Sequence, residues 1–203
     1  VPNPDLKPET SYNVEYGIQR KLGKGFKVEF VNYFSFLRNA LVRRNFTFNS
    51  QSQIIFDGEL SQVQAEVNAG RAFVWGMSRN AALNLGQGMS LKSNLTFTDG
   101  EDSIENLPLR HVAPLFGQTS LNLEQSKLKA QFSVRYSGGI AFEDLAPSEQ
   151  NKAQLYTANG ALAWYTLNLN LSYALSEQIN LGLNLENLLD THYRPYSSGI
   201  SAP

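Results

Sequence analysis

The stretch WYTLNLNLSYALSEQINLGLNLENLLD, from Trp164 to Asp190, decides the fold. Between Tyr165 and Leu175 every second residue is aromatic or apolar, and the residues between them are Thr, Asn, Ser and Ala. This alternation predicts a β-strand, because successive side chains of a pleated chain point to opposite faces. After the polar break at 176–178, the same pattern returns from Ile179 to Leu185. The stretch therefore predicts a hairpin with a tight turn.

Each arm of this hairpin is about as long as the roughly 9–11 residues that a tilted strand needs to cross a bilayer. It is about twice the typical soluble strand of roughly 5–6 residues. Similar alternation recurs along the chain and predicts about eight strands in all. The other six lie at Tyr12–Ile18, Phe26–Leu37, Phe73–Leu85, Met89–Phe97, Thr119–Leu123 and Leu128–Tyr136. Within Phe26–Leu37 the apolar residues change parity, which predicts a β-bulge.

The connections between these strands alternate between tight turns and long polar segments. The long segments are Asn39–Gly70, Thr98–Phe116 and Gly138–Ala163, with a possible β excursion at Ile54–Phe56. All three fall on one side of the predicted sheet, as in outer-membrane barrels. Aromatic residues near the strand ends are expected to form a membrane-interface girdle. They are Trp75, Phe97, Tyr136, Trp164 and Tyr165 at the long-loop ends, and Tyr173 near the other end.

Composition narrows the function classes. The 203 residues carry 17 basic and 18 acidic side chains, so a net charge of -1 gives no electrostatic case for nucleic acid. The absence of cysteine excludes disulfides and thiolate metal sites. Mean hydropathy is -0.30, and no apolar run is long enough for a spanning helix. A β-barrel remains possible, because its strands alternate apolar and polar residues and contain no long apolar run. No signal peptide is visible, so we expect a mature or internal segment.

Three stretches resemble the barrel of TonB-dependent outer-membrane receptors. They are NPDLKPETSYNVEYG at Asn3–Gly17, PLRHVAPLFG at Pro108–Gly117 and NLENLLDTHYRPYSSGISAP at Asn184–Pro203. The resemblance implies an all-β, antiparallel, up-and-down transmembrane barrel, of which this chain is a part. Its roughly eight strands would belong to the plugged, 22-stranded class, with extracellular long loops and periplasmic turns. Residues 1–203 would be the C-terminal segment, without the plug domain and the final strand.

The family resemblance implies a receptor and transporter segment in the outer membrane of a Gram-negative bacterium. Such receptors use the TonB complex to import a scarce nutrient, such as a ferric siderophore, haem, cobalamin or an oligomer. The implied partners are that small ligand, outer-membrane lipid and lipopolysaccharide, the plug and remaining strands, and TonB through the absent N-terminal part. We expect no enzyme activity and no cofactor, because no catalytic constellation or phosphate-binding loop is legible.

Candidate ligand-binding residues lie in the predicted outer loops. The arginines could hold an anionic substrate or, together with Arg38, lipopolysaccharide phosphates, although solvated loop charge also explains them. The histidines could touch a metal-bearing ligand, but they lack the neighbouring ligands of a metal centre. Arg110 and His111 lie in the PLRHVAP stretch that resembles the family, so a structural role in the loop is the alternative to ligand binding for these two residues. The set is Arg43, Arg44, Arg110, His111, His192 and Arg194.

A second set is expected to face the lumen, where it would line the passage or meet the plug. Its members occupy the polar positions of the predicted strands. They are Glu15, Lys92, Lys129, Arg135, Asn168, Asn170 and Glu186.

Two other readings remain open from the residues alone. A self-contained small barrel acting as an adhesin or structural protein requires Tyr12–Ile18 to pair with Ile179–Leu185. A soluble β domain binding carbohydrate requires the leucines of the hairpin, such as Leu167 and Leu181, to be buried in a core.

Overall fold

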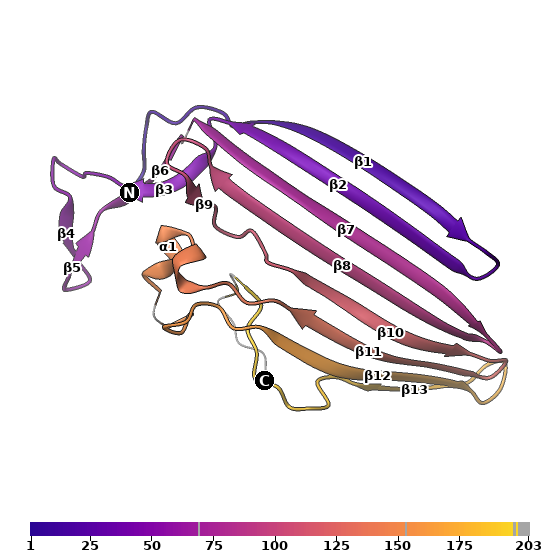
Figure 1. Ribbon diagram of the computed structural model, residues 1–203. Helices are drawn as coiled ribbons and strands as arrows, with labels where there is room; N and C mark the ends of the chain where they lie inside the picture. Colours follow the sequence, from indigo (N-terminus) through magenta and orange to yellow (C-terminus); the bar gives the residue numbers. More distant parts are fainter. Residues whose placement is uncertain (69, 153, 197, 199–203) are drawn as a thin grey trace.

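The computed structural model describes residues 1–68, 70–152, 154–196 and 198. Its main feature is one curved antiparallel sheet in which eight strands follow one another, each paired with its neighbour (Figure 1). The order is β1 (Thr10–Leu22), β2 (Phe26–Arg38), β7 (Arg71–Gly86), β8 (Met89–Asp102), β10 (Phe116–Glu124), β11 (Leu128–Ser137), β12 (Trp164–Ala174) and β13 (Asn180–Leu185). The prediction of about eight up-and-down strands is confirmed.

Short turns and long loops occupy opposite ends of the sheet, as predicted (Figure 1). The loop between β2 and β7 contains two small two-stranded sheets. One pairs β3 (Leu41–Asn45) with β6 (Gln64–Asn68), and the other is the hairpin of β4 (Gln53–Phe56) with β5 (Glu59–Gln62). The loop after β8 contains β9 (Leu107–Pro108), and the loop after β11 contains η1 (Phe142–Asp144) and α1 (Pro147–Gln150). The sequence had indicated only the excursion at Ile54–Phe56.

The two faces of the sheet differ in chemistry. Leu169 opposes Phe132 on β11 and Leu185 on β13, so these side chains share one face, which we call the apolar face. Asn170 opposes Gln131 and Asn184 on the other face, the polar face. The apolar positions predicted in one strand therefore lie beside the apolar positions of its neighbours, and the polar positions beside polar ones.

No second layer of the described residues covers the apolar face. Leu181 is 56% exposed and Val14 is 58% exposed. The buried apolar side chains in the described part of the chain are instead few and mostly small, and they include Ala40, Val63 and Leu145. A soluble β domain with these leucines in its core is therefore ruled out, because a water-soluble sheet of this size buries one face.

The sheet is open. Among the described residues β1 pairs only with β2 and β13 pairs only with β12, and the two lie at opposite edges (Figure 1). The self-contained small barrel required these two strands to pair, so that reading is wrong for the described chain. Two unpaired edges leave rows of backbone N–H and C=O groups without partners, which a strand in lipid does not tolerate.

The bulge predicted within Phe26–Leu37 is wrong. The registers of β2 with β1 and with β7 run without a shift, and the irregularity lies at Asn84 and Gly86 beside the next turn. Parity misled the prediction because Val31, Tyr33 and Leu37 point to the polar face, and Asn32 points to the apolar face. Tyr33 lies over Gly76 of β7, where the absence of a side chain leaves room for its ring.

Candidate functional site

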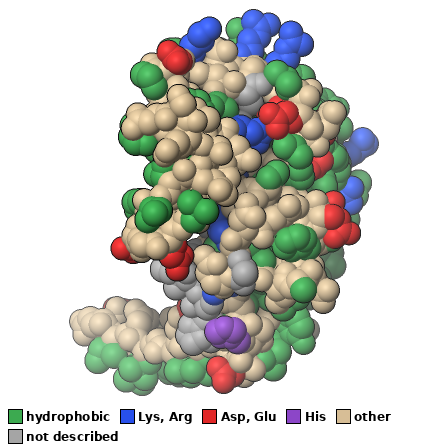
Figure 2. Space-filling model, turned by 90° about the vertical axis from the view of Figure 1, so that its left-hand side faces the viewer, with side chains coloured by type: hydrophobic (Ala, Val, Ile, Leu, Met, Phe, Trp, Pro, Cys, Tyr) green, Lys and Arg blue, Asp and Glu red, His purple; other side chains and the backbone are tan. Residues whose placement is uncertain are grey.

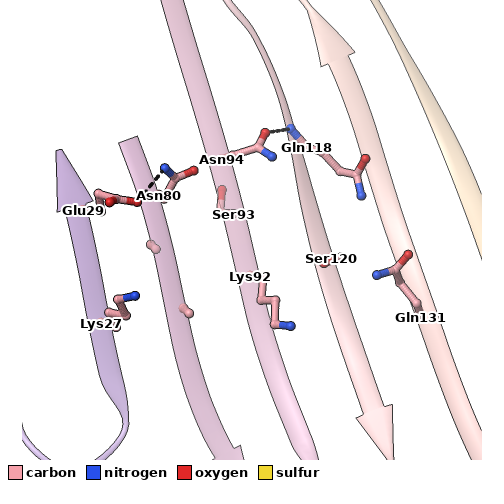
Figure 3. A pocket seen from close by; sticks show the side chains of 11 residues that line it. Lys27, Glu29, Asn80, Lys92, Ser93, Asn94, Gln118, Ser120 and Gln131 are labelled. Atoms are coloured by element: carbon pink, nitrogen blue, oxygen red, sulfur yellow. Dashed lines mark hydrogen bonds between the residues drawn. The ribbon is translucent and has the colours of Figure 1, made fainter. Parts of the chain in front are cut away.

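The polar face forms a continuous wall of amide, hydroxyl and charged side chains. One row crosses five adjacent strands, because each member opposes the next in the strand register. Its members are Glu29, Asn80, Asn94, Gln118 and Arg135. Asn80 Nδ2 donates to Glu29 Oε2 at 3.1 Å, and Asn94 Oδ1 accepts from the Gln118 N–H at 2.9 Å (Figure 3). A hollow in the wall is lined by the first four members of this row, Glu29, Asn80, Asn94 and Gln118.

Two lysines project into this hollow from the row below. Lys27 comes from β2 and Lys92 from β8, and Figure 3 shows Lys92 near Ser120 of the next strand, with Lys27 two strands away on the other side. Within the described chain neither ammonium lies within ion-pair distance of a carboxylate. Their charge is therefore available to a group that approaches this face from outside the chain.

A second hollow lies nearer the turns. Lys129 Nζ and Glu124 Oε1 form an exposed ion pair at 2.9 Å on its wall. Asn170 and Asn184 line it from β12 and β13. The charges of this ion pair cancel, so Lys92, which also lines this hollow, supplies its remaining net charge.

A third hollow lies at the loop end of the same face and is more aromatic. Arg135 lies there beside Phe116, Trp164 and Tyr196, together with Gln118. The ring centroids of Trp164 and Tyr193 are 4.2 Å apart. An arginine among aromatic rings and amides can hold a planar or anionic group by hydrogen bonds and stacking.

The predicted lumen-facing residues gather on this one face. Register places Glu15, Lys92, Lys129, Arg135, Asn168 and Asn170 there, and Glu186 follows β13, with its Oε1 accepting from Asn184 Nδ2 at 3.0 Å. Asn168 is buried, and its Oδ1 accepts from the Asn187 N–H at 3.0 Å. This bond, together with that from the Leu188 N–H to the Leu167 carbonyl oxygen at 2.8 Å, holds the segment after β13 alongside β12.

The predicted girdle residues divide between the faces. Trp75, Phe97, Tyr136, Tyr165 and Tyr173 lie on the apolar face, where Trp75 and Phe97 have ring centroids 5.3 Å apart. Trp164 points to the polar face with Thr166, so it does not share a face with the other five. Neighbouring strand residues such as Trp164 and Tyr165 cannot both meet the same surface.

The predicted ligand-binding arginines are not brought together, and each is engaged within the loops. Arg43 pairs with Glu66 at 3.4 Å, and Arg44 pairs with buried Asp102 and with Glu105. Arg110 pairs with Glu149, and Arg194 Nη1 donates to the Gln154 carbonyl at 3.1 Å. Figure 2 views this loop end, where acidic and basic side chains are scattered among polar and apolar ones.

The two predicted histidines lie apart from any cluster of metal ligands. His111 has a positive φ of 62° in the loop after β8, and His192 is exposed after β13. In the described ranges there is no group of three or more His, Asp or Glu side chains placed to hold a metal ion. The left-handed backbone at His111 points to a structural role in the loop turn.

Glu149 is a site residue that the sequence did not reveal. Its carboxylate is fully buried, and it accepts hydrogen bonds from Arg110 Nε at 3.1 Å, Lys152 Nζ at 2.8 Å and Tyr156 OH at 2.7 Å. Burial raises the pKa of this carboxyl, but the bonds from Lys152 and Tyr156 and the charges of Lys152 and Arg110 outweigh burial and lower the pKa overall. Arg110 and Glu149 lie 39 residues apart, and no local pattern links them.

None of the helices in the described residues has the length and apolarity of a membrane span. One apolar and one polar face, long strands and one-sided loops define a segment of barrel wall of the outer-membrane type. The chain belongs to the family "TonB dependent receptor-like, beta-barrel", whose model matches residues 1–188. Members of this family are outer-membrane proteins of Gram-negative bacteria.

Solved structures show the same fold. The "Copper transporter OprC" is 17% identical with a TM-score of 0.75, over 95% of this chain and 27% of that chain. The ferric yersiniabactin uptake receptor FyuA from Yersinia pestis is 18% identical with a TM-score of 0.62, covering 95% and 27%. The FrpB iron transporter from Neisseria meningitidis is 16% identical with a TM-score of 0.67, covering 96% and 29%. The chain thus spans under a third of the length of these proteins. A search of curated proteins found no match.

Proposed function

We propose that this chain is part of the barrel of an outer-membrane receptor that imports a small, scarce nutrient with energy from the TonB complex. The observation that carries the proposal is the sheet with two chemically different faces, exposed leucines on one and hollowed polar rows on the other. In a barrel the first face would contact lipid and the second would contact water, ligand or plug.

The open edges support a position within a larger barrel. The unpaired sides of β1 and β13 would pair with further strands of the same receptor, and the family-like ending at Asn184–Pro203 favours a C-terminal position. The long loops would be extracellular and the turns periplasmic. The plug would lie against the polar face, and TonB would act through the part of the receptor outside residues 1–203.

The aromatic hollow around Arg135 is the part of this chain best suited to meet the nutrient. It lies on the polar face at the loop end, where a ligand arriving from outside would first contact the barrel interior. The named cargoes of the similar structures suggest ferric chelates and copper as the first candidates, followed by haem, cobalamin and oligomers.

The test is uptake of labelled nutrients by cells with and without the gene of the complete receptor, each in backgrounds with and without a working TonB complex. Ferric siderophores, copper, haem, cobalamin and oligosaccharides are offered in turn. We expect deletion to abolish high-affinity uptake of one class, and loss of TonB to abolish it equally. Uptake of every class that is unchanged by both deletions would contradict the proposal.

A further inference from the structure

Two arginines face each other on the apolar face at the loop end of the sheet. Arg38 ends β2 and Arg71 begins β7, and they are direct partners in the strand register. Both share the face of Phe36 and Phe73, which are the next partners on this face. Thr10 of β1 completes the row on the other side of Arg38.

Neither guanidinium is neutralised within the described chain. Both side chains are exposed, no ion pair involves them, and Arg38 lies 5.5 Å from the ring of Tyr12. The acidic groups of this face are Asp99, which accepts from Trp75 Nε1 at 3.3 Å, and Glu101, which opposes Phe73. Like charges directly opposite on neighbouring strands are destabilising, so an anion placed between them would stabilise this end of the sheet.

The arginine pair borders a belt of aromatic rings. The centroids of Phe36 and Phe73 are 5.2 Å apart, and those of Trp75 and Phe97 are 5.3 Å apart. Leu85 marks the turn end of β7, and Arg71 stands fourteen positions before it. At roughly 3.4 Å per residue and a strand tilt of about 40°, the two residues are about 36 Å apart along the membrane normal. An apolar band is about 25 Å tall, so the pair would lie roughly 10 Å beyond it, at the level of lipid headgroups.

We propose that Arg38 and Arg71 form a binding site for the phosphate of a phosphorylated lipid headgroup in the outer leaflet. The proposal rests on the proposed function only for its membrane setting. Two guanidinium forks can each give two parallel N–H···O bonds to phosphate oxygens, and the aromatic belt contacts the acyl region of the same lipid. The remaining basic side chains of this face, Arg20 and Arg79, lie closer to the turns.

The test measures lipid binding to the complete receptor, purified in detergent, by native mass spectrometry and by titration with bisphosphorylated lipid A. Monophosphoryl lipid A and inorganic phosphate serve as separate probes. The variants are Arg38→Gln, Arg71→Gln and their combination. Arg20→Gln is the matched control, since it removes the same charge from the same face at the turn end. Folding is checked by the heat-dependent mobility shift of intact barrels on gels.

We expect the double variant to bind bisphosphorylated lipid A about tenfold more weakly or worse, because charge-assisted hydrogen bonds are lost. The Arg20→Gln control should stay within about twofold, and inorganic phosphate should bind neither protein. Unchanged lipid binding by a folded double variant, or equal binding of inorganic phosphate, would overturn the site. Lipid binding is measured without nutrient or TonB, so its failure is distinct from failure of the import proposal.

Discussion

Arg110 Nε lies 3.1 Å from Glu149 Oε1, and this contact ties the loop after β8 to the loop after β11. Lys152 and Tyr156 donate to the same buried carboxylate from within the second loop. Arg110 therefore joins the two loops, while Lys152 and Tyr156 fix the Glu149 carboxylate within its own loop. If the proposed function is right, the position of these loops decides what can enter.

Replacing Glu149 by Gln should loosen the loop at 138–163. A neutral amide cannot satisfy three donors, so the loop should lose about 1–3 kcal/mol of docking free energy, or about tenfold to hundredfold in amide protection. Hydrogen exchange of the complete receptor measures this directly. Glu143→Gln is the matched control, because Glu143 is exposed and should leave protection unchanged. Equal protection in Glu149→Gln and wild type would show that the carboxylate does not hold the loop.

The same contact should make loop docking sensitive to acid. The pKa of Glu149 is lower in the folded loop than in the released one, so its contribution is fully present above the ordinary glutamate range and disappears as pH falls through the lowered pKa. Residues 1–203 contain no cysteine, so an Ala158→Cys variant accepts a single fluorescent label once any cysteine elsewhere in the complete receptor has been replaced by serine. Label mobility should rise in acid in wild type, whereas in Glu149→Gln it should be high and insensitive to pH. A wild-type label whose mobility is flat down to strong acid would contradict the linkage.

Gly76 should not accept a side chain. A Cβ there would overlap the Tyr33 ring and lie 2.6 Å from the Phe97 carbonyl oxygen, so Tyr33 would have to leave its hydrogen bond with Thr98. We expect Gly76→Ala to destabilise the barrel by about 1–3 kcal/mol, visible as a lower unfolding temperature in the gel mobility assay. Gly17→Ala is the control, because the nearest neighbour of its Cβ would be Val31 Cγ2 at an ordinary contact distance of 3.6 Å. A Gly76→Ala barrel as stable as Gly17→Ala would refute the close packing.

Tyr33 also explains where strand prediction from the sequence succeeded and failed. Period-two alternation located the eight strands because each face meets one environment over its whole length, as Tyr165–Leu175 shows. Phe26–Leu37 broke the pattern because packing over a glycine on the next strand, a non-local contact, put an aromatic ring on the polar face. Such a contact has no signature within the strand itself.

The candidate site was also predictable only in part: its strand residues could be placed from the sequence, and its loop residues could not. Strand positions such as Lys92 and Asn170 could be assigned to the polar face from parity alone. Loop residues could not be placed, because the partner of each arginine lies far along the chain, as Asp102 does for Arg44. The loop arginines therefore looked available for a ligand, although Arg43, Arg44 and Arg110 are engaged in ion pairs and Arg194 donates to a backbone carbonyl.

The unpaired lysines of the polar face offer a test of what covers that face. If the plug lies against this face in the complete receptor, Lys27 and Lys92 should react slowly with an amine-specific acylating reagent, because burial blocks access of the reagent. Deletion of the plug should then raise the labelling of both lysines about tenfold or more. Lys24 lies exposed in the turn between β1 and β2 and should label fast in both proteins, which makes it the internal control. Peptide mass spectrometry reads all three sites in one sample. Equal labelling of Lys27 and Lys92 with and without the plug would mean that the polar face is open to solvent in the whole receptor, and the assignment of that face to the plug would then be wrong.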